Sequence, residues 1–170
     1  PLNNPLPVWD MLAGNAAATG LLAAERYRSR TQKGQIIHLA LTDIAFNAVA
    51  NSGITAEIQV NGNHRSYNGN DIYGSYGHDF ETADNRRVMV VAVTTRMWEN
   101  LLNATDLNQT FKDFSDKQNI DISDEHVRYD WRKEITKILQ PWFLARKLKE
   151  IETKLTEHSV CWEKFQTFSQ

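Results

Sequence analysis

Small residues recur with a helical period in the first part of the chain. The repeating positions are Ala13, Ala16, Ala17, Gly20, Leu21 and Ala24. This spacing predicts one face of a helix that begins at Asp10 and lets another backbone approach closely. Residues 35–41 form a nearly continuous apolar run, typical of a strand buried on both faces, and a short helix is predicted over residues 44–50. Helix, buried strand and helix together predict an α/β fold, a fragment of a Rossmann-like large domain.

The amino-acid composition changes in the middle of the chain. Residues 54–75 are rich in polar residues and glycine, and we expect a linker with possible strand character over 55–60. Residues 76–82 and 87–93 then predict a β-hairpin, because Asp84-Asn85 between them tolerates the positive φ of a tight turn. The run from Val88 to Val93 is the most apolar of the chain and predicts a central strand.

The remaining sequence predicts helices followed by a strand. Thr94 or Thr95 is expected to cap a helix, and 103–122 to form polar loop or short helix. A long amphipathic helix is predicted from Ser123, broken or kinked at Pro141, then a helix over 147–157 and a strand over 159–162. We therefore expect 1–53 to belong to the large domain, 54–75 to link, and 76–170 to form a small α+β domain with the hairpin and several helices.

Composition narrows the function classes. The 170 residues are 41% hydrophobic and 24% charged, with a net charge of −2, so no strong field attracts nucleic acid or an anionic membrane. The longest run of low polarity, residues 11–24, is shorter than the roughly 20 apolar residues that span a bilayer. A single cysteine excludes an internal disulfide and fits a reducing, cytoplasmic compartment.

No metal site is predicted. The five histidines form no metal-binding motif, and His38 is more simply a core residue in the predicted strand. Cys161 is interpreted as a packed, inert thiol. We expect no metal and no resident cofactor.

Two segments are candidates for chemistry. Asp10 is a favoured helix cap, and its position at a helix start would also suit a carboxylate that must remain ionised. The loop around Gly69, Asn70, Tyr73 and Gly74 could cover a ligand, although a turn-rich approach to the hairpin explains it more simply.

The segment from Asp10 to Gln35 resembles the family III CoA-transferases, which include formyl-CoA transferase, carnitine CoA-transferase and α-methylacyl-CoA racemase. The matching pieces are Asp10, Gly14, 20–24, Arg28, Thr31 and 33–35, then 77–84 with 88–91, and finally 141–142, Leu148 and 160–162. The resemblance is strongest to members that move CoA from C1 to C4 of mesaconyl-CoA. That subgroup is indicated by 8–10, 22–26, 69–70, 73–74, 79–82 and 87–91.

The resemblance implies that Asp10 is the nucleophile that attacks an acyl-CoA thioester. It implies a mixed anhydride, then an aspartyl-CoA thioester, then transfer to an acceptor carboxylate. Coenzyme A would be part of the substrate, and Gly69, Asn70, Tyr73 and Gly74 would contact the substrate. An interlocked homodimer is implied as well, and the chain is expected to be an internal fragment of a longer enzyme.

Two departures from the family pattern affect the expected activity. The glycine-rich loop of the transferases is reduced to Gly69, so gating by this loop is not expected. The glutamate that racemases carry after the hairpin is Thr94 here, which disfavours a racemase-like acyl-CoA isomerase. The alternative that stays open is a non-catalytic folding or dimerisation module.

Overall fold

The chain divides into two units in the computed structural model, Pro1–Ser66 and Tyr67–Gln170, and each is described here by itself. The structure describes residues 6–62, 64–65 and 67–169. Mixed α/β structure is confirmed, and all of the strands in the described residues form a small antiparallel sheet in the second unit.

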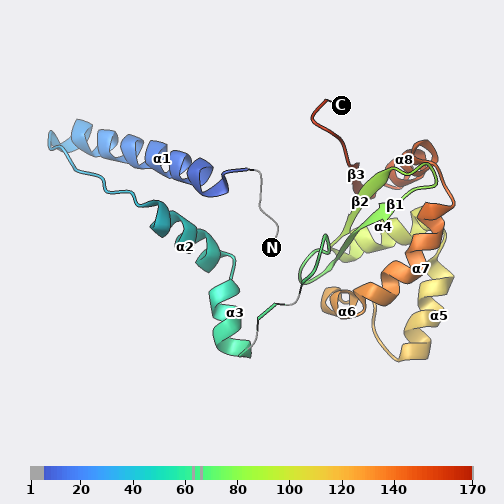
Figure 1. Ribbon diagram of the computed structural model, residues 1–170. Helices are drawn as coiled ribbons and strands as arrows, with labels where there is room; N and C mark the ends of the chain where they lie inside the picture. Colours follow the sequence, from blue (N-terminus) through green and yellow to red (C-terminus); the bar gives the residue numbers. More distant parts are fainter. Residues whose placement is uncertain (1–5, 63, 66, 170) are drawn as a thin grey trace. The chain divides into compact units, whose positions relative to one another are not determined.

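Helices make up the regular structure of the first unit. They are α1 (Val8–Thr31), α2 (Leu41–Asn51) and α3 (Ile54–Asn61), and none of the three has a fully buried residue. After α1 the chain reverses and runs back along this helix to α2 (Figure 1). The helix predicted over 44–50 is thereby confirmed as α2.

The strand predicted over residues 35–41 is wrong for this structure. Residues 33–40 have no regular structure, and the Ile36 side chain is 85% exposed. His38, expected in the core of that strand, is exposed as well. A strand of this kind needs neighbouring strands as hydrogen-bond partners, and the described residues of the first unit form none. The Rossmann-like arrangement therefore stays a prediction.

The small-residue face of α1 packs against this returning segment. Its partly buried residues are Ala13, Ala16, Gly20 and Ala24, as the helical period predicts. A Cβ on Gly20 would lie 3.6 Å from Cγ2 of Ile37, an ordinary contact, and Gly14 has nothing within 4 Å. Close approach to another backbone thus does not account for either glycine in this structure.

Helix α3 replaces the first part of the predicted linker. The segment expected to have strand character is helical because glycines in the left-handed region flank it, Gly53 at φ 74° and Gly62 at φ 69°. The boundary between the two units falls after it. The assignment of 1–53 and 76–170 to the large and small domains of a whole enzyme stays a prediction.

The predicted hairpin and its sheet are confirmed in the second unit. Strands β1 (Tyr76–Glu81) and β2 (Arg87–Ala92) are antiparallel, with Asn85 at φ 55° in the turn. Strand β3 (Cys161–Lys164) pairs with β2, which is therefore the central strand. Cys161 was expected to be packed, but it is exposed because it lies on an edge strand.

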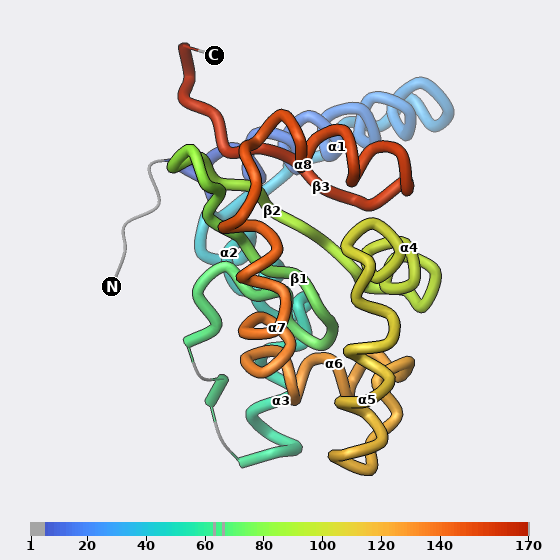
Figure 2. Tube along the Cα trace, turned by 90° about the vertical axis from the view of Figure 1, so that its right-hand side faces the viewer, coloured from blue at the N-terminus to red at the C-terminus, as the bar shows by residue number. Residues whose placement is uncertain are grey.

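Five helices pack around the sheet. They are α4 (Thr95–Thr105), α5 (Asn108–Gln118), α6 (Glu125–Asp130), α7 (Arg132–Leu144) and α8 (Leu148–Glu157). The long helix predicted from Ser123 is interrupted at Trp131, which separates α6 from α7, whereas Pro141 lies inside α7 without ending it. In Figure 2 the orange tube of α7 runs alongside β1, which it contacts.

The core of this unit lies between the sheet and the helices. Phe80 of β1 stacks on Phe143 of α7 at 4.1 Å between ring centroids. Edge-to-face contacts extend from Tyr76 through Trp98 to Phe111. Burial of such aromatic side chains, at 150–250 Å² each, supplies most of the hydrophobic stabilisation. The sheet is thus a rigid base for the loops at its ends.

Candidate functional site

Asp10 lies in the first turn of α1. The helix begins after Pro7, and the Met11 N–H donates to the Pro7 carbonyl at 3.0 Å. Pro7, not Asp10, is therefore the cap, and no side chain caps this end. The interpretation of Asp10 as a plain N-cap is therefore wrong, because the N-cap lies three residues earlier in the chain.

The carboxylate of Asp10 is exposed. Within the part of the chain that the structure describes, no side chain forms a hydrogen bond or an ion pair with it. The backbone N–H groups of the first helical turn lack intrahelical acceptors. Asp10 is thus an accessible carboxylate beside unpaired backbone donors.

The predicted ligand loop belongs to the second unit. Gly69 at φ 60° and Gly74 at φ 79° both adopt a backbone conformation that favours glycine. Between them, the Asp71 N–H donates to the Asn68 carbonyl at 3.0 Å and closes a turn. Asn70 is exposed at this turn. Gly69, Asn70, Tyr73 and Gly74 therefore share one loop, whereas Asp10 belongs to the other unit.

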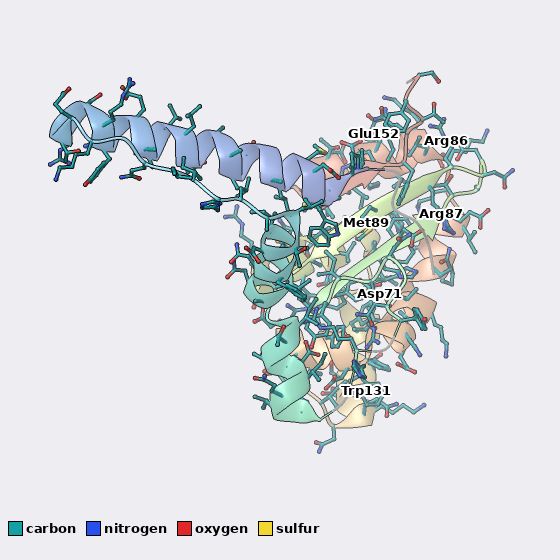
Figure 3. The ribbon with its side chains drawn as sticks, turned by 60° about the vertical axis from the view of Figure 1, so that its left-hand side comes forward. Asp71, Arg86, Arg87, Met89, Trp131 and Glu152 are labelled. Carbon is teal, nitrogen blue, oxygen red and sulfur yellow. The ribbon has the colours of Figure 1, made fainter. Side chains whose placement is uncertain are left out.

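A charged cluster anchors this loop, and sequence reasoning missed it. The two carboxylate oxygens of Asp71 lie 2.5 Å from Nδ1 of His78 on β1 and 3.3 Å from Nε of Arg132 on α7. The contact to Arg132 has the distance of an ion pair without hydrogen-bond geometry. Figure 3 labels Asp71 beside the sheet. No sequence motif joins these residues, because they come from a loop, a strand and a helix.

Thr94 is the residue that the sequence resemblance aligns with the glutamate of the racemases. It caps α4 directly after β2, and its Oγ1 accepts a hydrogen bond from the Met97 N–H at 3.2 Å. The cap predicted for this helix is confirmed. A hydroxyl engaged in capping does not supply the carboxylate base that proton abstraction at C2 of an acyl-CoA would use.

The end of β2 is fixed by a buried guanidinium. Arg128 has no exposed surface and donates to the carbonyls of Ile122, Ser123 and Val93 at 2.7–3.1 Å. Burial lowers the pKa of this side chain. Ser75 Oγ donates to the same Val93 carbonyl at 3.0 Å, so the last residue of the loop is fixed as well.

Two hollows elsewhere on the surface contain none of the predicted site residues. One, of about 540 Å³, is lined by Ala145, Arg146, Glu150, Thr153 and Lys154. The other, of about 490 Å³, runs along α1 and is lined by Ala23, Arg26, Tyr27, Arg30 and Thr31. Both are open and shallow, so neither by itself is a substrate pocket.

The described residues contain neither a candidate metal cluster nor a candidate membrane-spanning helix. Over residues 6–62, 64–65 and 67–169, no three His, Cys, Asp or Glu side chains gather closely enough to hold a metal ion. Over the same ranges no helix has the length and apolar character to cross a membrane.

Comparisons with known sequences agree with the resemblance. The model of the family described as CoA-transferase family III matches residues 1–170. The chain is also 39% identical over 166 residues to a protein of Chloroflexus aurantiacus named 2-methylfumaryl-CoA isomerase. This match covers 98% of the chain but 41% of the relative, so the chain spans about two fifths of the relative's length.

Comparisons with solved structures support the same fold. Two crystal structures of the hypothetical protein Rv3272 from Mycobacterium tuberculosis match the whole chain with TM-scores of 0.72 and 0.75. Sequence identities are 21% and 19%, and the matches cover 42% and 41% of those chains. At such identities the likeness extends to the fold alone.

Proposed function

Since the chain belongs to CoA-transferase family III, we propose that the full-length protein moves coenzyme A between carboxylates, with Asp10 as nucleophile. The observation that carries this proposal is the placement of Asp10, an exposed carboxylate in the first turn of α1. The match to a relative named 2-methylfumaryl-CoA isomerase supports the substrate class, an unsaturated diacid joined to CoA.

The proposed reaction proceeds by four displacements at carbonyl carbons. Asp10 attacks the thioester, and a mixed anhydride forms as the CoA thiolate leaves. The thiolate then attacks the Asp10 carbonyl, which gives an aspartyl-CoA thioester and releases the acyl carboxylate. The acceptor carboxylate attacks this thioester and forms a second anhydride, and the thiolate finally attacks its acyl carbon and regenerates Asp10. Charge and atoms balance at each step, and no metal or redox cofactor takes part.

The first turn of α1 has a defined task in this scheme. Asp10 lies at the N-terminal end of α1, where the backbone N–H groups of the first turn have no intrahelical acceptors. The same N–H groups are donors that could stabilise the oxyanion of a tetrahedral intermediate. The loop with Gly69, Asn70, Tyr73 and Gly74 is proposed to contact the acyl-CoA.

The intramolecular form of this reaction is the more specific proposal. In it, donor and acceptor are the C1 and C4 carboxyls of one mesaconyl (2-methylfumaryl) unit. Full-length protein incubated with mesaconyl-CoA labelled with ¹³C at C1 should convert the C1 thioester into the C4 thioester, as followed by NMR. Absence of this shift, with transfer only to an added free acid, would exclude the intramolecular form. With a saturated 2-methylacyl-CoA, which carries a hydrogen at C2, incorporation of solvent deuterium at C2 would instead support a racemase-like isomerase.

A second candidate concerns the chain alone. None of α1, α2 and α3 has a buried residue, which favours a folding or dimerisation module without activity of its own. Size-exclusion chromatography and titration of the 170-residue chain with CoA test this. Self-association without CoA binding is expected, and tight stoichiometric binding would contradict it. The interlocked homodimer and the cytoplasmic location are further proposals for the full-length protein.

A further inference from the structure

The loop from Tyr67 to Ser75 is held by one carboxylate that reaches two elements. Asp71 contacts His78 on β1 through one oxygen and Arg132 on α7 through the other. The exposed fractions of the three side chains are 16%, 27% and 14%, so the cluster is largely shielded from solvent. The charge pair of Asp71 with Arg132, shielded in this way, is screened less than a surface pair, and the loss of Asp71 leaves the Arg132 charge uncompensated.

The partner on α7 is itself held in place. The guanidinium of Arg132 lies 4.2 Å from the ring centroid of Tyr129 and donates to the Tyr129 carbonyl at 2.8 Å. A planar guanidinium that stacks and donates in this way is preorganised for a carboxylate, which a lysine would not be. Arg132 is therefore a fixed anchor for Asp71.

Tyr129, which contacts Arg132, also contacts the loop. Its hydroxyl donates to Oδ1 of Asn68 at 3.3 Å, and its ring meets that of Tyr73 edge to face at 5.2 Å. Asn68 precedes Asp71 and Tyr73 follows it, so both arms of the loop contact the same ring. The loop also returns to β1, because the Ile72 N–H donates to the Gly77 carbonyl at 3.0 Å.

The backbone of the loop depends on such side-chain anchors. Gly69 and Gly74, on either side of Asp71, are residues with wide conformational freedom. Three of the side chains that fix the segment between them, those of Asp71, Arg132 and Tyr129, act together as one connected network.

The geometry points to Asp71 as a positioning residue that fixes the conformation of the loop carrying Gly69, Asn70, Tyr73 and Gly74. Its effect on catalysis rests on the proposed function, because that loop is proposed to contact the acyl-CoA. Its effect on the conformation of the loop does not depend on the proposed function.

Hydrogen exchange in the full-length protein tests the loop directly. In Asp71→Asn the loop amides, above all that of Ile72, should exchange about tenfold faster, with the amides of β2 unchanged. Asp79→Asn is the matched control. Asp79 is a shielded carboxylate on β1 that pairs with Arg87 at 2.7 Å, and among the described residues it forms no hydrogen bond or ion pair with the loop. Unchanged loop exchange in Asp71→Asn, or equal acceleration in Asp79→Asn, would overturn the proposal.

A second variant, Arg132→Lys, tests the same contact in case Asp71→Asn does not fold. Arg132→Lys keeps the charge and loses the planar group, and it should accelerate loop exchange less than Asp71→Asn does. In the double variant Asp71→Asn/Arg132→Gln the two effects should be strongly non-additive, because both substitutions break one unit. Simple additivity would contradict a shared network.

Kinetics test the catalytic consequence. Asp71→Asn should raise KM for the acyl-CoA about fivefold or more with a smaller change in kcat, since the residue acts on binding through the loop. Asp71→Glu, which retains the carboxylate, should recover part of the loss. A fall in kcat with KM unchanged would contradict a positioning role. If the unsubstituted protein transfers no CoA, the proposed function fails, while the exchange measurement still decides the role of Asp71.

Discussion

The guanidinium of Arg128 donates at 2.8 Å to the carbonyl of Val93, the residue between β2 and the cap of α4. A fully buried charge therefore joins the last turn of α6 to the end of the central strand. Nη1 of the same side chain donates to the carbonyls of Ile122 and Ser123, so one residue contacts three carbonyls. This explains why a charged residue can lie in the core.

Arg128→Met should strongly destabilise the second unit. The carbonyls of Ile122 and Ser123 lose the Arg128 donor and that of Val93 keeps only Ser75 Oγ, so we expect a loss of about 3 kcal/mol in opening free energy. The measurement is native-state hydrogen exchange of the β2 amides in the full-length protein. Arg96→Met, the same substitution at an exposed position of α4, should change this value by less than about 0.5 kcal/mol. Equal effects of the two variants would contradict the role given to Arg128.

Gly77→Ala should destabilise the start of β1. A Cβ on this glycine would lie 2.6 Å from Cγ1 and 3.2 Å from Cβ of Ile72, so the chain of Ile72 must shift. Overpacking of this kind costs about 2 kcal/mol. Exchange of the β1 amides measures the cost. Adding Ile72→Ala should restore part of the stability lost in Gly77→Ala, because it removes the atoms that clash. Further destabilisation by the second substitution would argue against this packing.

Ionisation of Asp84 should make the free energy of unfolding depend on pH in the acidic range. Its Oδ1 accepts hydrogen bonds from Thr82 Oγ1 at 2.6 Å and from the Leu148 N–H at 3.0 Å, and these bonds lower the pKa of the carboxyl below its ordinary 3.8. A carboxyl with a lowered folded-state pKa contributes stability that is present above the unfolded pKa and is lost as pH falls through the folded pKa. The hairpin turn is thus joined to α8 by an ionised group.

The check is urea unfolding of the full-length protein above and below pH 3.8. The stability difference between the unsubstituted protein and Asp84→Asn should shrink as pH falls below this value. Asp116→Asn, on the exposed face of α5, is the control and should show a small difference at every pH. A constant difference for Asp84→Asn across this range would count against the prediction.

Asp10→Asn should abolish CoA transfer by the full-length protein, by about a thousandfold or more, because the amide is not a competent nucleophile. The aspartyl-CoA adduct, seen as a mass increase of the intact protein with substrate, should disappear too. Asp43→Asn removes the equivalent first-turn charge from α2 and should retain turnover. Turnover that survives in Asp10→Asn would exclude this nucleophile.

The sequence by itself determined those elements whose signals are local. The apolar run of Val88–Val93 and the Asp84-Asn85 turn were sufficient for the hairpin, and Thr94 for the start of α4, since an apolar run, a turn and a cap each depend on residues nearby in the chain. The position of Asp10 near a helix start was predictable to within one turn for the same reason.

Tertiary structure decided whatever depends on distant partners. The apolar run of residues 35–41 has the composition of a buried strand, yet it is not one here because no strand in the described part of the first unit pairs with it. The contact of Asp71 with Arg132 was equally invisible, since a loop and a helix far apart in the chain meet only once the sheet has formed. Apolar runs, turns and caps depend on residues that are close in the chain. Strand pairing and ion pairs join residues that are far apart in the chain, so they exist only once it has folded.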